Sequence, residues 1–515
     1  MTKKNLLFFI SIFLIIVLFG ALYKLYIPRV NAFGCFDDCF NYLGGYFINS
    51  GKRIFLDFFF NHQPGMAYLS AGIQNLLNTS SIPDLILRHR QIIFLISFAS
   101  TMCLFLKFRY PILISAILYE PFKFYVFGDR FLAESIVGYL IIYMVGVCFY
   151  ALKGRISKYD LYVVPFLAFL IIFFREPFIP AAIFLLATYL TLVKKVTKKI
   201  PIISLLIFIA PFSIFLTYDF AFYYLNLVTV NKLVIAPDAS GITPLISLLT
   251  SIFYPVVLIA TPGGFGFLRI LFILYSICFL LLMLIYAKME KNVLISLFIL
   301  ATLFLVNLRP VGANQTFYEA FHVAPWLLVF TFTMSLLTIE ILKKSRRLGV
   351  ISIALLALSA IFLLTNKSYF MYEKVDTSSE YFTNFSNIMD TGTTIRNLAN
   401  SDDTLFVDGY DDLIIWEAKL PSAYKYTWYT SYMPKVELYE HERNTLLENS
   451  IPDFYYGKCL KVLAKEGSKA SRSLYNNYIQ INPAKDKSCI LIRKDKASSI
   501  SFEKREKIAG TKYKL

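Results

Sequence analysis

Long apolar runs are the feature that most constrains this chain. Runs long enough to cross a bilayer, for which a helix needs roughly 20 residues, recur from the amino terminus to about residue 364. A soluble core cannot account for them, because 57% of the 515 residues are hydrophobic and only 17% are charged, against about 25% in ordinary soluble domains. We predict about eleven to thirteen membrane crossings. The clearest predicted spans are 5–23, 91–106, 131–152, 161–174, 178–193, 200–218, 242–260, 267–287, 293–306, 325–342 and 348–364.

Three apolar runs need separate treatment. The shorter runs 64–77 and 111–127 fit spans, half-spans or interfacial helices. The first run, 5–23, has the position of a signal peptide. It is long, has no small-residue cleavage site and precedes many further spans, so we expect a retained anchor.

The positive charges predict the orientation of the chain. The net charge is +17, and residues 1–365 hold 29 basic against 14 acidic side chains, whereas residues 366–515 hold 22 against 20. The excess therefore belongs to membrane loops rather than to a nucleic-acid-binding domain, and positive loops stay cytoplasmic. We expect a multi-pass protein of the plasma membrane with a cytoplasmic amino terminus, a first external loop at 24–63 and an external tail. The basic clusters lie at 3–4, 88–90, 153–155, 194–199, 288–291 and 343–347.

The predicted fold class is an all-α polytopic membrane domain over residues 1–364, followed by a C-terminal extracytoplasmic mixed α/β domain over residues 365–515. Cys459 and Cys489 of this tail could pair, because an external compartment permits disulfides. The tail segments TLFVDG (404–409), YIQI (478–481) and CILIRK (489–494) predict strands, and RNTLLENS (443–450) predicts a helix.

Three carboxylates crowd the first external loop. Asp37 and Asp38 lie between two cysteines in CFDDC, and Asp57 follows about 20 residues later. Adjacent residues do not share a helix face, so one carboxylate can meet a substrate while the other caps a helix or contacts a neighbour. The pair fits a general base in a water-poor site, a cation site of a transporter, or a metal site. A disulfide four residues apart within a helix would be strained, so we expect Cys35 and Cys39 to be unpaired.

Ionisable groups also stand at the predicted outer ends of later spans. Such groups are costly at membrane depth and tend to line polar cavities, and arginine forks onto phosphate oxygens. A helix-terminal acid and snorkelling loops are the competing structural interpretations. The residues are Arg130 and Glu134 in FGDRFLAES, Arg175 in FFREPF, and Arg309, Tyr318 and His322 in NLRPVGANQTFYEAFHVAPW. Four further acids border spans and are expected in solvated loops: Asp84, Asp160, Glu290 and Glu340.

These features together resemble the GT-C class of multi-spanning glycosyltransferases, in the branch of protein O-mannosyltransferases and aminoarabinose transferases that use polyprenyl-phosphate sugars. In that pattern an acidic pair of the first external loop precedes a tyrosine, and a G…D…H-P-P-G stretch leads into the second span. The chain departs from the pattern in carrying Asp-Asp for Asp-Glu and Gln-Pro for the double proline. The matching residues are Asp37, Asp38, Tyr42, Gly51, Asp57, His62, Pro64 and Gly65, with similar segments at 130–135, 402–416 and 421–428.

The resemblance implies transfer of a sugar from a polyprenyl-phosphate carrier to an acceptor hydroxyl outside the membrane, with inversion. Asp37 would be the general base, and Asp38 would orient it or hold the acceptor. Tyr42, Asp57, His62 and Glu134 would line the cavity, with Tyr318 and His322 as further binding residues. Arg130, Arg175 and Arg309 would hold the donor phosphate. Asp57, His62 and Glu134 are also the candidate ligands of a divalent cation (Mg²⁺, Mn²⁺ or Zn²⁺), which members of the class do not uniformly need.

Two other functions stay open on the sequence. A transporter or flippase of lipid-linked sugars would explain many spans and internal arginines, but it predicts charges scattered deep within several helices. An envelope glycan ligase or polymerase uses similar donors, but it would carry its functional loop between late spans. The expected partners in the first interpretation are the lipid-linked donor, the bilayer and a protein, lipid or glycan acceptor, with no nucleic acid.

Overall fold

The computed structural model describes residues 3–30, 34–35, 37–194, 200–235, 266–290, 293–307, 321–367, 369, 371, 385–409, 411–427, 436–483 and 486–515. Within these ranges, seven helices are long and apolar enough to cross a membrane, or eight if a bent pair at 202–233 is one span. The predicted span 242–260 lies outside the described residues, so the predicted number of crossings stays a prediction. The chain is a multi-pass membrane protein with a helical membrane part, as the apolar runs indicated.

The described residues fall into two compact units, each built from segments far apart in the sequence. The first unit joins Met1–Val30, Arg90–Thr217 and Asp238–Val375, and the second joins Asn31–His89, Tyr218–Pro237 and Asp376–Leu515. Most of the loop predicted to be external, from Asn31 onward, thus belongs to the same unit as the tail. The predicted boundary after residue 364 separates a membrane part from an external part. The division into two compact units does not test it, so it stays a prediction.

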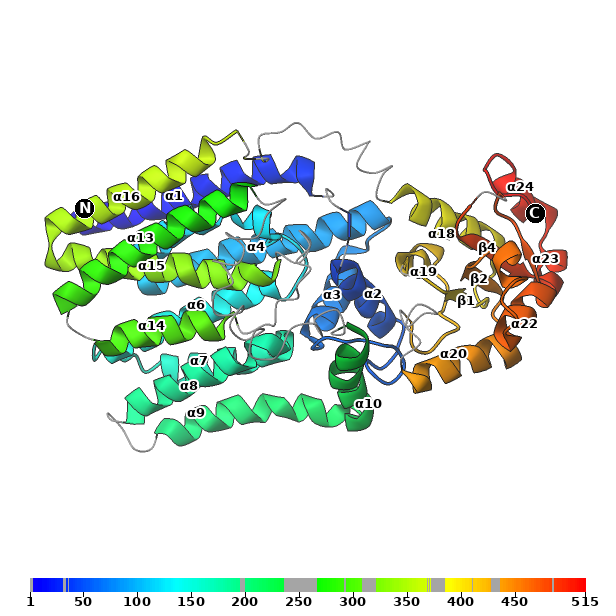
Figure 1. Cartoon of the computed structure of the whole chain (residues 1–515), viewed down its shortest axis with the longest axis horizontal. Coiled ribbons are helices and arrows are strands. Elements are labelled where there is room, and N and C mark those ends of the chain that lie inside the picture. The colour runs from blue at the N-terminus through cyan, green and yellow to red at the C-terminus, as the bar shows by residue number, and fades with distance from the viewer. Residues whose placement is uncertain are drawn as a thin grey trace. The chain divides into compact units, whose positions relative to one another are not determined.

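Apolar helices run side by side in the first unit (Figure 1). The most buried of them, α15 (Ala324–Lys344), packs on α5, α6, α13 and α16. Gly138 lets α6 approach it closely, because a Cβ there would lie 3.2 Å from the Pro325 Cα. The other helices are α1 (Lys3–Tyr26), α4 (Ile82–Phe108), α5 (Tyr110–Tyr119), α6 (Glu134–Leu152), α7 (Asp160–Phe174), α8 (Ile179–Lys194), α9 (Ile200–Ile209), α13 (Gly266–Glu290), α14 (Val293–Leu305) and α16 (Arg346–Leu364), with short helices η1 (Ile27–Arg29), η2 (Lys123–Val126), η3 (Glu176–Phe178) and η4 (Ala210–Thr217).

The second unit begins with a helical hairpin, α2 (Asp37–Asn49) and α3 (Gly65–Leu77). The two helices touch at Gly45, where a Cβ would lie 2.6 Å from the Ser70 Oγ. Buried phenylalanines of the connecting loop, such as Phe58 and Phe60, belong to one hydrophobic core with Phe406 and Phe454 of the tail. The helical segment α10 (Phe220–Tyr224) and η5 (Leu225–Ile235) adds Leu227 and Val230 to this core.

The tail is mixed α/β, as predicted, and all three predicted strand segments contain strands. Its four-stranded sheet has the order β1-β2-β4-β3, with β1 parallel to β2 and the other pairs antiparallel. The strands are β1 (Leu405–Val407), β2 (Phe454–Gly457), β3 (Tyr478–Gln480) and β4 (Cys489–Arg493). The helices are α18 (Ser386–Leu398), α19 (Leu413–Ala418), α20 (Glu437–Asn449), α21 (Leu460–Leu463), α22 (Lys469–Asn477), α23 (Lys494–Ser499) and α24 (Phe502–Ala509).

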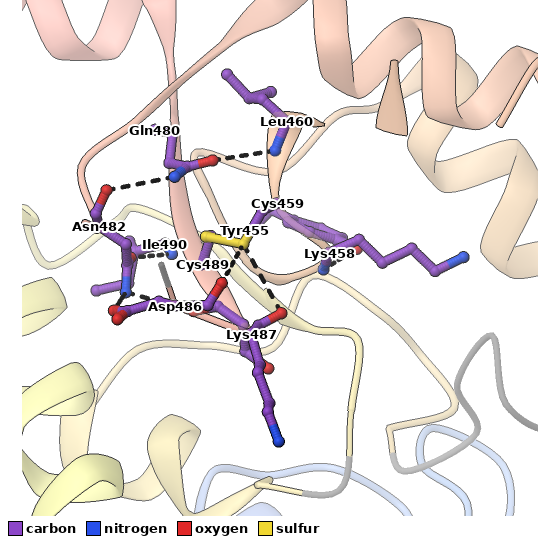
Figure 2. The surroundings of a disulfide bond; sticks show 11 residues. Tyr455, Lys458, Cys459, Leu460, Gln480, Asn482, Asp486, Lys487, Cys489 and Ile490 are labelled. Carbon is purple, nitrogen blue, oxygen red and sulfur yellow. Dashed lines mark hydrogen bonds between the residues drawn. A yellow bond between two sulfur atoms is a disulfide. The ribbon is translucent and has the colours of Figure 1, made fainter. Parts of the chain in front are cut away.

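A disulfide joins Cys459, just before α21, to Cys489 of β4, with a Cα–Cα distance of 5.0 Å (Figure 2). The prediction that these two cysteines pair is confirmed. Hydrogen bonds support the same corner: the Gln480 side chain accepts from the Leu460 N–H at 3.0 Å. The disulfide therefore ties the segment after β2 to the antiparallel strand β4 beside it.

We predict that Cys459→Ser lowers the free energy of unfolding by about 2–4 kcal/mol, because the cross-link no longer restricts the unfolded chain. The measurement is denaturant unfolding of the purified protein in detergent, followed by tail-specific proteolysis. Cys103→Ser, which removes an exposed free cysteine, is the control. Equal stability of the two variants would contradict the structural role of the bond.

In the described part of the tail, the carboxyl group of Asp412 is buried and has no hydrogen bond to compensate for the loss of water. Asp412 precedes α19 and is 6% exposed, and within the described part of the chain neither of its side-chain oxygens has a hydrogen-bond partner. Burial raises the pKa of the Asp412 carboxyl well above its usual range, and the adjacent Asp411 carboxylate raises it further. The folded state therefore holds this proton more tightly than the unfolded state does.

A raised pKa of this kind stabilises the folded state at low pH, and that stabilisation is lost as the pH rises above the unfolded-state value of about 3.9. We expect Asp412→Asn, which cannot ionise, to lose less stability than the wild type between mildly acidic and neutral pH. Melting temperatures in detergent across this pH range measure the difference. Parallel pH profiles would show that Asp412 titrates normally.

Candidate functional site

The first turn of α2 separates the environments of the two adjacent acids. Asp37 and Asp38 both stand where the helix dipole favours a negative charge. The side chain of Asp37 is 45% exposed, whereas Asp38 is 1% exposed. The two carboxylates therefore differ in exposure, and Asp37 is the member of the pair that is open to solvent.

Tyr42 provides the hydrogen-bond donor that the buried Asp38 needs. Its hydroxyl donates to the Asp38 Oδ2 at 3.1 Å, one helical turn away on the same face. Tyr42 itself is fully buried. A buried carboxylate without a donor would be strongly disfavoured, so this contact fixes both side chains together.

His89 packs against Tyr42, with ring centroids 4.5 Å apart. Its Nδ1 lies 2.7 Å from the Leu85 carbonyl oxygen, which can only accept, so Nδ1 carries a hydrogen. In the neutral imidazole the Nε2 then accepts from the Ser70 hydroxyl at 2.9 Å. Gln74 donates to the Ser70 Oγ at 3.0 Å and to the Tyr42 carbonyl at 2.8 Å. A polar network therefore lies beneath the acidic pair.

The residues of this network do not stand out in the sequence. The sequence predicts His89 as part of a basic cluster at 88–90, but His89 is fully buried, and its neighbour Arg88 pairs with Asp84 at 3.1 Å. The spacing of Ser70 and Gln74, four residues apart on one helix face, was the available signal.

His62 lies beside the exposed acid of the pair. Its Nε2 is 3.9 Å from the Asp37 Oδ2, and its ring meets Phe40 and Phe60 edge-on, with centroids 6.0 and 6.2 Å away. The loop that carries His62 is fastened by Asn226, which accepts from the Phe60 N–H at 3.1 Å and donates to the Phe55 carbonyl at 3.2 Å. The structure thus brings Asp37, Asp38, Tyr42 and His62 together.

Asp57 has local partners. Arg53 donates to its two carboxylate oxygens at 3.0 and 3.2 Å, and the Arg53 backbone N–H adds a bond of 2.9 Å. These contacts close the turn at residues 53–57. The predicted substrate or metal role of Asp57 stays a prediction.

Cys35 and Cys39 form a disulfide, so the expectation of unpaired cysteines is wrong. That expectation assumed that both residues lie in a helix. The helix begins only at Asp37, so Cys35 lies before it, and the two Cα atoms are 5.4 Å apart. The bond encloses the acidic pair in a short covalent ring.

A second polar cluster lies in the first unit. Glu134, at the start of α6, accepts from the Arg175 Nε at 2.8 Å and contacts the His322 Nδ1 at 3.0 Å. Arg130 is also buried, with its Nε 4.0 Å from the Asp129 Oδ2. Two of the predicted residues, Arg175 and His322, therefore meet around the carboxylate of a third, Glu134. The predicted Arg309 and Tyr318 lie outside the described residues.

Two of the acids expected in solvated loops are buried, so that expectation is wrong for them. The Asp160 side chain is 5% exposed and receives Lys107 at 2.6 Å and Tyr143 at 2.8 Å. Glu340 pairs with Lys153 and Lys343. Lys153 and Lys343, which belong to the predicted loop clusters, reach back to Glu340, and a lysine outside those clusters, Lys107, reaches Asp160; these contacts compensate the burial.

A metal centre does not emerge from the described side chains. In the ranges given above, no three His, Cys, Asp or Glu residues stand together as a group that could hold a metal ion. The predicted ligands Asp57, His62 and Glu134 are engaged with Arg53, Asp37 and Arg175, respectively. A divalent cation at these residues stays a prediction.

Comparison with known proteins gives a likeness in fold. No protein-family profile matches the chain, and no curated protein matches it. The chain is similar to the crystal structure of ArnT from Cupriavidus metallidurans bound to undecaprenyl phosphate, with 13% identity and a TM-score of 0.57. The match covers 92% of this chain and 97% of that chain. At this identity the likeness shows the fold, which is the polytopic GT-C fold that the sequence predicted.

We predict that Glu134→Ala destabilises the protein by about 3–5 kcal/mol, because the buried Arg175 guanidinium loses its nearer carboxylate and keeps Glu176 at the longer distance of 3.6 Å. The melting temperature in detergent measures the effect. Glu503→Ala breaks an exposed pair with Lys507 and should change stability by less than about 1 kcal/mol. A loss no larger than that of this control would show that the cluster around Glu134 is solvated.

Proposed function

We propose that this protein is a glycosyltransferase that moves a sugar from a polyprenyl-phosphate carrier to an acceptor hydroxyl at the outer face of the membrane. The observation that carries the proposal is the unequal burial of Asp37 and Asp38, in a fold like that of a protein bound to undecaprenyl phosphate. The exposed carboxylate of Asp37 can act as the base, while the buried carboxylate of Asp38 is held in one position.

In the proposed reaction Asp37 takes the proton of the acceptor hydroxyl. The acceptor oxygen then attacks the anomeric carbon, and the bond from that carbon to the phosphate oxygen breaks. The products are the glycosylated acceptor and polyprenyl phosphate, and attack opposite the leaving group inverts the anomeric centre. General-base assistance of this kind typically contributes 10²–10⁴-fold to a rate.

The neighbours of Asp37 suit this role. Asp38, held by Tyr42, orients the first turn of α2 and keeps a negative charge behind the base. His62, 3.9 Å from Asp37, can stabilise the charged carboxylate before the proton arrives. Asp57 would support the same loop through its contact with Arg53.

Donor binding is proposed for the arginine-containing segments. A lipid-linked donor enters sideways from the bilayer and leaves a phosphate, which arginine stabilises by paired hydrogen bonds. Arg130, Arg175 and Arg309 are the candidates, with Glu134 and His322 orienting Arg175 and Tyr318 as a further contact. No step of the proposed reaction depends on a divalent cation.

The disulfides support the proposed placement of this chemistry. Cys35–Cys39 flanks the acidic pair and Cys459–Cys489 lies in the tail. Disulfides persist in oxidising compartments and are rare in the cytosol. The acidic pair and the tail therefore both suit an extracytoplasmic location.

The first test is release of undecaprenyl phosphate from undecaprenyl-phosphate mannose, glucose or 4-amino-4-deoxyarabinose, in membranes that contain native acceptors. We expect Asp37→Asn to reduce release at least 10²-fold, because the base is lost while the shape is kept. Asp84→Asn, the same change at a carboxylate paired with the half-exposed Arg88, is the matched control.

Full activity of Asp37→Asn would overturn the assignment of the base. Absence of release from every donor, with wild-type protein in native membranes, would count against the transferase itself. Transport of these lipids by the purified protein in liposomes, without release, would then favour the flippase hypothesis.

A further inference from the structure

We propose that the tail acts as the positioning element of the acidic pair, through a hydrogen-bond relay from Trp416 to Gln74 to Tyr42. This inference rests on the proposed function, because it assigns a role in that reaction to residues outside the first loop. It assigns Trp416 and Gln74 as positioning residues, which act on Asp38 through Tyr42.

The hairpin and the tail share one interior. The core that contains Phe40, Leu43 and Phe47 of α2 continues into Ile414 and Ile415 of α19 and through the tail sheet. The hairpin buries its apolar side only when the tail is present. Its position is therefore set by the tail and not by the loop alone.

Polar contacts cross the same boundary at several points. The Tyr46 hydroxyl donates to the Leu420 carbonyl at 3.4 Å, and the Lys52 ammonium donates to the Ser422 carbonyl at 3.4 Å. The rings of Phe59 and Tyr439 meet edge-on, with centroids 5.8 Å apart. These contacts anchor the far end of α2 and the loop after it.

Trp416 makes the contact that reaches the acids. It is 1% exposed and is the largest fully buried side chain of the described chain. Its Nε1–H donates to the Gln74 Oε1 at 3.1 Å. A buried indole N–H needs an acceptor, and a single acceptor at this distance fixes the rotation of the Gln74 amide.

The orientation of the Gln74 amide decides which of its atoms faces the carbonyl of Tyr42, the residue that holds Asp38. With its oxygen turned to Trp416, its nitrogen donates to the Tyr42 carbonyl at 2.8 Å and to the Ser70 Oγ at 3.0 Å. Without Trp416 the amide can rotate by half a turn, which would face its oxygen toward the Tyr42 carbonyl. The repulsion would move Tyr42, whose hydroxyl holds Asp38 at 3.1 Å.

The structural arm of the test is hydrogen–deuterium exchange of the full-length protein in detergent. Trp416→Phe keeps an aromatic ring but removes the donor. We expect faster exchange in the segment 37–49 that carries the acids. Tyr424→Phe is the matched control, because it removes a buried hydrogen bond of 2.8 Å to the Tyr439 carbonyl within the tail. Equal protection of 37–49 in wild type and Trp416→Phe would overturn the relay.

The functional arm uses the undecaprenyl-phosphate sugar that the wild type accepts among the three donors named above. We expect Trp416→Phe and Gln74→Leu each to lower kcat about 3- to 10-fold, with little change of KM for the donor, because one hydrogen bond is lost behind the base. The double variant should lose no more than the worse single variant, since both changes break one relay.

The two arms separate the possible failures. Equal kcat for Trp416→Phe and Tyr424→Phe, or fully multiplicative losses in the double variant, would overturn the positioning role while the transferase stands. Faster exchange of 37–49 with no release from any donor would support the structural relay and count against the transferase.

Discussion

The rest of the candidate site depends on one constraint, which is that the Asp38 carboxylate is buried and must receive a hydrogen bond. Tyr42 supplies it from the next turn of the same helix. Tyr42 is then itself confined, because His89 packs on its ring and Gln74 holds its backbone carbonyl. Fixing the inner acid leaves the outer one, Asp37, as the member of the pair that is open to solvent.

The same constraint explains why the segment that carries α2 and α3 needs a large partner. Thirteen-residue helices such as α2 and α3 are marginal in isolation. Their stability comes from burial against α19 and the tail sheet, with which they form one core. The two disulfides add covalent restraint to this unit: one encloses the acidic pair, and the other joins the segment after β2 to the neighbouring central strand β4.

In the first unit, buried carboxylates are compensated by ion pairs. Its buried carboxylates are each met by a cation: Glu134 by Arg175, Asp160 by Lys107 and Glu120 by Lys123. Paired charges of this kind are weak sources of net stability, since desolvation offsets most of the attraction. Their value lies in fixing the geometry of a polar interior, and the proposed donor site is built on one of them.

The sequence by itself determined the class of fold. Three features could be recognised in the sequence because they depend on composition and short spacings. They are the apolar runs of membrane length, the strand signals of the tail, and the order of Asp37, Asp38, Tyr42 and His62. The buried network of Ser70, Gln74, His89 and Trp416 could not be recognised, and neither could the Cys35–Cys39 bond. Those depend on where helices end and on which side chains, hundreds of residues apart, meet in one core. Only the tertiary structure decided them, because a polar residue is predictable as buried only when its partner is known.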